Sequence, residues 1–200
     1  MTPGDAVIRI SQLGRALNCA DLHNITRINI SDEVDSIGPH QIADVVPNAL
    51  MLNGNLMTAR DIPALLHFRA LQMIVAHRIG FAGALLNEVS IFRELRVIAM
   101  SDTAVTDKDV LSLQNSPRLV SIGLARTQIT DAAMATFATL PDLELLDVCD
   151  TQISLHGLQS FRHHHNLLSV NVKGTRVTAK DAEQFRSQVA NLLPDLEVRV

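Results

Sequence analysis

One pattern of residues recurs every 24 positions through most of this chain, and that period constrains the fold more than any other feature. The segment from Leu95 to Asp195 divides into four aligned copies, which begin at Leu95, Leu119, Leu143 and Leu167. A period between about 20 and 50 residues indicates a solenoid, in which each unit buries its apolar face against its neighbours. The period predicts an elongated stack of repeats, and it does not identify a binding partner.

The same frame extends toward the N-terminus. Units begin near residues 25, 47, 71, 95, 119, 143 and 167, and a final strand is expected over 196–200. Residues 1–24 are less regular, and we interpret them as a variant N-terminal cap or a degenerate first repeat, because a terminal repeat has one face without a neighbour. We therefore expect a single repeat domain over residues 25–200.

The spacing of the apolar residues changes within each unit. Positions four and six alternate as in a strand with one buried face, and positions sixteen and nineteen are three apart, as on a helix. Helix starts are marked by a Thr followed by an acid, close to a capping box, at Thr58/Asp61, Thr106/Asp109 and Thr178/Asp181, with a related start at Thr130–Asp131. The nineteenth position predicts a stacked core ladder of Leu65, Val89, Leu113, Phe137, Phe161 and Phe185.

The frame LxxLxLxxTxITDxxLxxLxxLPx resembles the leucine-rich repeat family. It is most similar to the variant with a Thr-x-Ile/Val-Thr-Asp turn, which occurs in bacterial repeat proteins and in the repeat halves of F-box adaptors. The resemblance implies an α/β leucine-rich repeat solenoid, a horseshoe with a parallel sheet on its concave side and short helices on its convex side. Unit 71–94 departs from the pattern, because Ile79 replaces the turn Thr and Ala82 replaces the capping Thr.

No residue pattern predicts catalysis. The ninth position holds Asn55 and then Thr103, Thr127, Thr151 and Thr175, but no base recurs beside these hydroxyls, as a nucleophile would need. A hydroxyl at the end of a buried strand more simply satisfies backbone groups. Cys149 also lacks a neighbouring base, and the scattered acids form no pair for acid–base chemistry. We predict that the chain is not an enzyme and holds no cofactor.

The run His163–His165 is not predicted to bind a metal. Three consecutive residues cannot all face one ion from a regular element, and no Cys or acid completes a tetrahedral set. The run falls where a helix is expected to end, which predicts a solvated position.

Composition narrows the classes of partner. The net charge is −4, the only lysines are Lys108, Lys173 and Lys180, and no cluster of cations is apparent, so nucleic acid is not expected as a direct ligand. No apolar run approaches the roughly 18 residues that a membrane span requires.

Cysteine usage predicts a reducing, cytoplasmic setting. Cys19 and Cys149 lie in separate units and form no disulfide framework. An organellar presequence is the alternative. Arg9, Arg15 and Ser11 are compatible with one, whereas Asp5 argues against it.

The concave side is the predicted partner-binding surface, because positions three, five and seven of each unit point out of the sheet there. In the middle units these residues are small or apolar, Ala49 and Ala125 among them, and a large exposed apolar patch usually marks an interaction site. The predicted site comprises Met51, Met73, Val75, Val97 and Ala99, a polar edge of His77, Arg78, Arg96 and Arg126, and Leu145 and Asp147 in a later unit. Two alternatives stay open: the N-terminal segment covers the patch, or the face is apolar without any partner.

These observations favour a non-enzymatic interaction scaffold or adaptor that binds a protein through its concave face. A permanent structural subunit is the first alternative, since strand 196–200 is an edge that could associate with a partner or a second copy. An F-box-like substrate receptor is the second, although residues 1–24 show no F-box-like helical module. Repeat solenoids host unrelated activities, so the fold alone does not decide among these functions.

Overall fold

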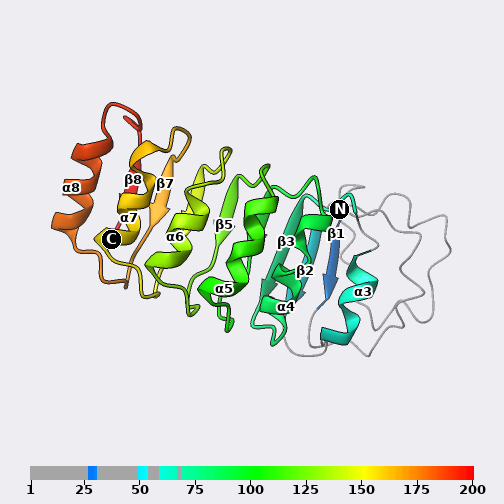
Figure 1. Ribbon diagram of the computed structural model, residues 1–200. Coiled ribbons are helices and arrows are strands. Elements are labelled where there is room, and N and C mark those ends of the chain that lie inside the picture. Colours follow the sequence, from blue (N-terminus) through cyan, green and yellow to red (C-terminus); the bar gives the residue numbers. More distant parts are fainter. Residues whose placement is uncertain (1–26, 31–48, 54–58, 67–68) are drawn as a thin grey trace, which may run out of the picture.

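The computed structural model describes residues 27–30, 49–53, 59–66 and 69–200. Within these ranges, eight parallel strands form one sheet in the order β1 to β8. The helices lie together on one side of that sheet, and the stack extends along a single axis from β1 to β8 and α8 (Figure 1). Residues 1–24, interpreted above as a cap, lie outside the described residues.

The strands are short and follow the repeat. Leu50 lies opposite Ile74, and Ile74 lies opposite Ile98, so the fourth-position column of the sequence is a row across the sheet. The strand prediction is confirmed, with the final strand covering 197–199. The strands are β1 (Arg27–Ile30), β2 (Ala49–Asn53), β3 (Met73–His77), β4 (Val97–Ala99), β5 (Ser121–Gly123), β6 (Leu145–Asp147), β7 (Ser169–Asn171) and β8 (Glu197–Arg199).

The segments that return the chain to the next strand are short helices, several of which continue as 3-10 helices (η). Helices of one or two turns are not stable in isolation, so the core beneath them must hold them in place. They are η2 (Ala59–Asp61), α3 (Ile62–Leu65), α4 (Ala82–Leu86), η3 (Val89–Ile91), α5 (Asp107–Val110), η4 (Leu111–Asn115), α6 (Asp131–Phe137), α7 (Leu155–Leu158), η5 (Gln159–His163) and α8 (Ala179–Val189). No described helix has the length and apolar character that a bilayer span requires.

The core lies between the sheet and the helices and runs the length of the stack. Phe137, Phe161 and Phe185 are completely buried one repeat apart. The predicted nineteenth-position ladder is therefore confirmed. Each ring packs within a cluster that is shared by successive units, so a single repeat could not bury its own apolar face.

The predicted capping boxes form at two helix starts. The backbone N–H of Thr106 donates to Asp109 Oδ2 (2.8 Å), and that of Thr178 donates to Asp181 Oδ2 (2.9 Å). Helix α4 begins at Ala82 without a side-chain cap, as expected from the departure of its unit from the repeat pattern. Thr58 lies outside the described residues.

Two aspartates tie neighbouring units together at their helix starts. The carboxylate of Asp107 accepts from the backbone N–H and the hydroxyl of Thr130 (both 2.7 Å). Asp131 accepts from the same groups of Ser154 (2.7 and 2.6 Å). Gly157 leaves room for this contact, because a Cβ there would lie 2.5 Å from Asp131 Oδ1. Each tie satisfies a helix-terminal N–H that would otherwise lack a partner.

The threonines of the ninth position have the structural role expected of them. Their hydroxyls donate to backbone carbonyls three residues earlier and so close the turn after each strand. The bonds join Thr103 to Met100 (2.7 Å), Thr127 to Leu124 (2.7 Å), Thr151 to Val148 (2.6 Å) and Thr175 to Val172 (2.6 Å). Asn55 lies outside the described residues.

His164 corrects the expectation that the whole histidine run is solvated. Its side chain is buried, and Nδ1 accepts from the N–H groups of Asn166 and Leu167 (3.2 and 3.1 Å). Nε2 lies 2.9 Å from the carbonyl oxygen of Leu140 and, with Nδ1 accepting, carries the proton. His163 and His165 are exposed. Among the described residues, no group of three or more His, Cys, Asp or Glu side chains is placed to hold a metal ion.

Candidate functional site

The described helices all lie on one side of the sheet, and we term the opposite side the sheet face (Figure 1). Exposure alternates along each strand: in β3, Met73, Val75 and His77 are half-buried, whereas Ile74 and Ala76 are buried in the core. Neighbouring strands lie about 4.8 Å apart, whereas helices with their side chains are about 10 Å wide. The sheet side of the stack is therefore the shorter, concave side.

Five of the predicted site residues lie together on this face. Met51, Val75 and Ala99 are opposite one another on β2, β3 and β4. Met73 and Val97 form the adjoining row. All five side chains are partly exposed, and we term them the apolar patch.

Leu145 and Asp147 lie on β6 and are separated from the apolar patch by β5, which contributes Ser121 and Gly123. Leu145 remains 45% exposed. Ala49 and Ala125, expected on the same surface, are instead buried. A methyl group is too short to rise above the longer side chains around it, so these two positions add little contact area.

Gly123 interrupts the middle row of the sheet face and has no evident backbone reason to be glycine. Among the described glycines, only Gly174 has a positive φ. A Cβ at Gly123 would meet Ala99 Cβ at 3.4 Å, an ordinary contact. Glycine weakens a strand, and where it persists it often marks the close approach of another backbone.

The edge at which the strands end carries charges that alternate in sign. Arg78, Asp102, Arg126 and Asp150 occupy equivalent turn positions, with left-handed φ values of 56, 59, 53 and 54°. Arg126 donates two hydrogen bonds to Asp102 (2.5 and 2.8 Å), and its NH1 group lies 3.8 Å from Asp150 Oδ2. The bond from Arg126 holds the pKa of Asp102 below its usual value. The predicted residues Arg78 and Arg126 thus lie in a charge-balanced row, which we term the paired rim.

His77 lies at the end of β3, beside the paired rim. Its Nδ1 accepts from the backbone N–H of Ser101 (3.2 Å), which fixes the ring against the next unit. This contact orients the half-buried imidazole between the apolar patch and the paired rim.

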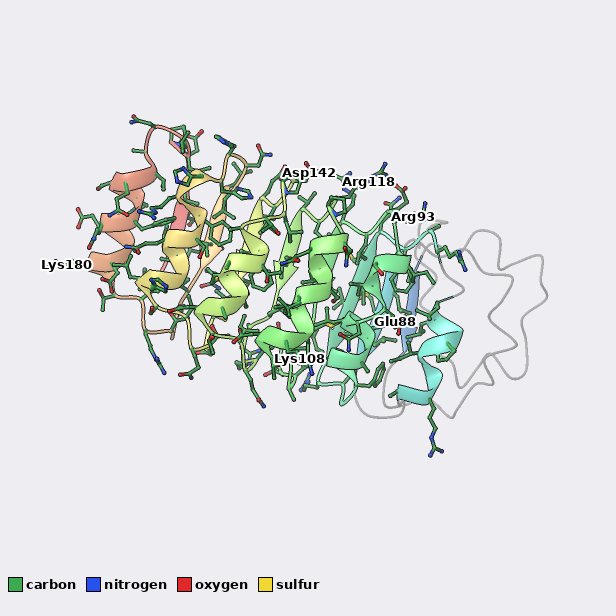
Figure 2. The ribbon with its side chains drawn as sticks, viewed as in Figure 1. Glu88, Arg93, Lys108, Arg118, Asp142 and Lys180 are labelled. Carbon is green, nitrogen blue, oxygen red and sulfur yellow. The ribbon has the colours of Figure 1, made fainter. Side chains whose placement is uncertain are left out.

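The edge at which the strands begin is basic. Four exposed arginines lie along this edge, on the three successive connections that lead into β3, β4 and β5. We term them the basic rim; they are Arg69, Arg93, Arg96 and Arg118. Figure 2 shows Arg93 and Arg118 along this edge, with Asp142 beyond them. Arg118 pairs with Glu94.

The basic rim corrects the expectation that no cations cluster. Of the four arginines in the basic rim, only Arg96 was among the predicted site residues. The four arginines fall in three different positions of the repeat, so a comparison of equivalent positions does not reveal them. A comparison of the connections between units would have done so.

Cys149 is a free, half-buried thiol beside Asp147. Burial, together with the hydrogen bond and negative charge of Asp147, raises the pKa of this thiol to about 11. The thiol is therefore protonated near neutral pH and is a poor nucleophile, as the absence of a base in the sequence indicates.

We expect slow alkylation of Cys149 in a Cys19→Ser variant. At pH 8 a pKa of about 11 instead of 9.0 lowers the thiolate fraction about 100-fold relative to an unperturbed cysteine peptide. Because a thiolate of higher pKa is also more nucleophilic, we expect the rate with iodoacetamide to fall at least about tenfold. Asp147→Asn should restore only part of the alkylation rate, because burial raises the pKa of the Cys149 thiol more than Asp147 does. Mass spectrometry of timed samples measures the rates, with the urea-unfolded chain as control. A native rate equal to that of the peptide would contradict this prediction.

Comparison with known proteins supports the fold. No family model matches the chain, and no curated protein matches its sequence. A solved structure of the LRR ectodomain of the Arabidopsis receptor kinase HAESA, in complex with an N-terminally extended IDA peptide hormone, is similar with a TM-score of 0.55 and 15% identity. The match covers 79% of this chain, which spans 27% of that ectodomain chain. With its parallel sheet and short helices in one repeating frame, the chain has the fold of an α/β leucine-rich repeat solenoid.

Proposed function

We propose that the chain belongs to the leucine-rich repeat family and is a non-enzymatic interaction scaffold that binds an extended segment of a partner protein on its sheet face. The observation that carries this proposal is the apolar patch on β2, β3 and β4, which lies beside the open position at Gly123. The HAESA ectodomain is described in complex with a peptide, and we propose a ligand of the same general kind here.

The patch suits a protein segment on physical grounds. Its side chains are held in register by the strands beneath them, so binding immobilises few further side-chain conformations and the entropic cost is small. Covering apolar surface contributes about 25 cal/mol per Å² removed from water. The two methionines can adapt to the shape of a partner, and Gly123 allows a backbone to approach the sheet closely.

The non-enzymatic part of the proposal rests on how the candidate nucleophiles are used. The threonine hydroxyls that end the strands donate to backbone carbonyls, and burial keeps the Cys149 thiol protonated. Because none of these candidate nucleophiles in the described ranges is activated, we propose binding as the simpler role for this face. We also retain the proposal of a reducing, cytoplasmic setting, which rests on cysteine usage.

A permanent structural subunit is the second candidate function, and the strand edge gives it little support. On β8, Glu197 and Arg199 pair with each other (2.6 Å) and are exposed. Charged side chains on a short edge strand discourage pairing with another strand. A permanent assembly through the sheet face would use the same surface as the proposed scaffold function.

The proposal is tested by filling the open position. Peptides are selected from a random phage-displayed library on the full chain and measured by fluorescence anisotropy. We expect Gly123→Leu to weaken their binding at least about tenfold, which corresponds to 1.4 kcal/mol, because the new side chain would occupy the approach to the sheet.

The matched control is Gly80→Leu, since a Cβ at Gly80 meets nothing within 4 Å and this exposed position lies outside the strands, between β3 and α4. Circular dichroism establishes that both variants fold. If every selected peptide binds Gly123→Leu as tightly as the wild type, the proposed scaffold function of the sheet face is overturned.

A further inference from the structure

We infer that the segment bound on the sheet face is acidic. Its apolar side chains cover the apolar patch, and aspartate or glutamate residues next to them pair with the basic rim. This inference rests on the proposed function and specifies the chemistry of its partner. It follows from the unequal distribution of charge at the two edges of the same face.

The basic rim has an excess of positive charge. It holds four arginines against the single carboxylate of Glu94, which pairs with Arg118. Within the described part of the chain, Arg69, Arg93 and Arg96 have no ion-pair partner among the salt bridges of the structure. Acidic side chains return only at the next connection, with Asp142 and Glu144.

The rim and the patch are continuous. Arg96 immediately precedes Val97 at the start of β4. Its N–H donates to the carbonyl of Gln72, and its own carbonyl accepts from Val120 (both 2.8 Å), which fixes its backbone between the neighbouring units. A partner that lies on Val97 and extends past the start of β4 would therefore reach the edge on which Arg96 is exposed.

The opposite edge offers no comparable attraction. In the paired rim, two arginines alternate with two aspartates, and Arg126 already binds Asp102 with two hydrogen bonds. An acidic residue placed there would compete with Asp102 and Asp150. The charge asymmetry therefore orients the partner, with its carboxylates over the starts of β3, β4 and β5.

Arginine is well suited to this role. Its planar guanidinium binds a carboxylate through two parallel hydrogen bonds, which are stronger than neutral hydrogen bonds. At an exposed rim the gain in affinity is modest, but charge complementarity excludes basic partners and raises the association rate. The basic rim therefore affects both the choice of partner segment and the affinity with which the segment binds.

The test compares peptides selected from one random phage-displayed library on four full-length baits. These are the wild type, Gly123→Leu, the rim variant Arg93→Glu/Arg96→Glu, and a control with the same charge change on the helix side, Arg162→Glu/Arg186→Glu. We expect wild type and control to enrich apolar peptides rich in Asp and Glu, and the rim variant to lose that acidic enrichment.

Affinities give a second measurement. A fluorescein-labelled acidic peptide from the wild-type selection should bind the rim variant at least about tenfold more weakly than it binds the wild type. Its binding to the wild type should also weaken as NaCl rises from about 50 to 300 mM, because salt screens exposed charges. Arg93→Gln/Arg96→Gln replaces the rim variant if circular dichroism shows that the glutamates prevent folding.

The outcomes separate the two proposals. Peptides whose binding is weakened by Gly123→Leu but which carry no excess of acidic residues would overturn this inference and would still support the scaffold function. Failure to select any peptide that discriminates Gly123→Leu from wild type would overturn the scaffold function itself. Fluorescein-labelled poly(U) RNA that binds the rim more tightly than the acidic peptide, and is lost in the rim variant, would also overturn the inference.

Discussion

Replacing Phe137 with alanine is expected to lower the free energy of unfolding by about 3–5 kcal/mol, which is the usual cost of truncating a buried phenylalanine. The ring is completely buried at the end of α6 and is the first of the three phenylalanines in the core ladder. Truncation removes apolar contact and leaves a cavity between two neighbouring units. Because neighbouring units share this core, the cavity should weaken the stack on both sides of α6.

Urea unfolding followed by circular dichroism measures this loss. Leu111→Ala is the matched control, because Leu111 lies in η4 with 52% of its surface exposed. Its truncation should change the unfolding free energy by no more than about 0.5 kcal/mol. A loss below about 1 kcal/mol for Phe137→Ala would mean that the core ladder does not hold the units together as described.

Replacing His164 with alanine should lower the free energy of unfolding by about 2–3 kcal/mol. The imidazole accepts from the backbone N–H groups of Asn166 and Leu167, and Nε2 pairs with the carbonyl of Leu140. Buried polar groups that lose a partner cost about 1–3 kcal/mol each, and the lost packing against Phe161, whose ring centroid lies 5.5 Å away, adds to this.

His164→Leu separates these two causes, because it restores the apolar volume but leaves the backbone groups unpaired. We expect its unfolding free energy to lie between those of the wild type and His164→Ala. His163→Ala is the control, since the neighbouring ring is exposed. Equal midpoints of denaturation for His163→Ala and His164→Ala would exclude the structural role of the buried imidazole.

Much of the fold was predictable because the repeat supplies several independent observations of one structure. Alternation at positions such as Ile98 and Met100 indicates a strand, and the same alternation in equivalent positions of other units fixes its register. The Phe137 ladder and the Thr106 capping box are inferred in the same way. The five members of the apolar patch were also predictable, because the orientation of a side chain on a strand follows from its position alone.

The unpredicted features either join positions of the repeat that are not equivalent or place an unusual residue type at an equivalent position. Asp131 reaches a serine in the next unit, His164 fills a core position that holds Leu140 one unit earlier, and the basic rim combines arginines from different positions of the repeat. Comparing equivalent positions treats each of these as an irregularity. Arg93 and Arg118 share an edge because both lie on connections that lead into strands, at different positions of the repeat (Figure 2).

The alternating charges of the paired rim restrict how this chain can gain or lose repeats. Arg126 follows Asp102 by 24 residues, and the same interval separates Arg78 from Asp102 and Arg126 from Asp150. Deleting the one unit that contains Asp102 would place Arg78 beside Arg126, two like charges at neighbouring turns. Deleting two adjacent units would preserve the order of signs. Shortening or lengthening of the stack, by recombination or by design, is therefore electrostatically easier in steps of two repeats than in steps of one.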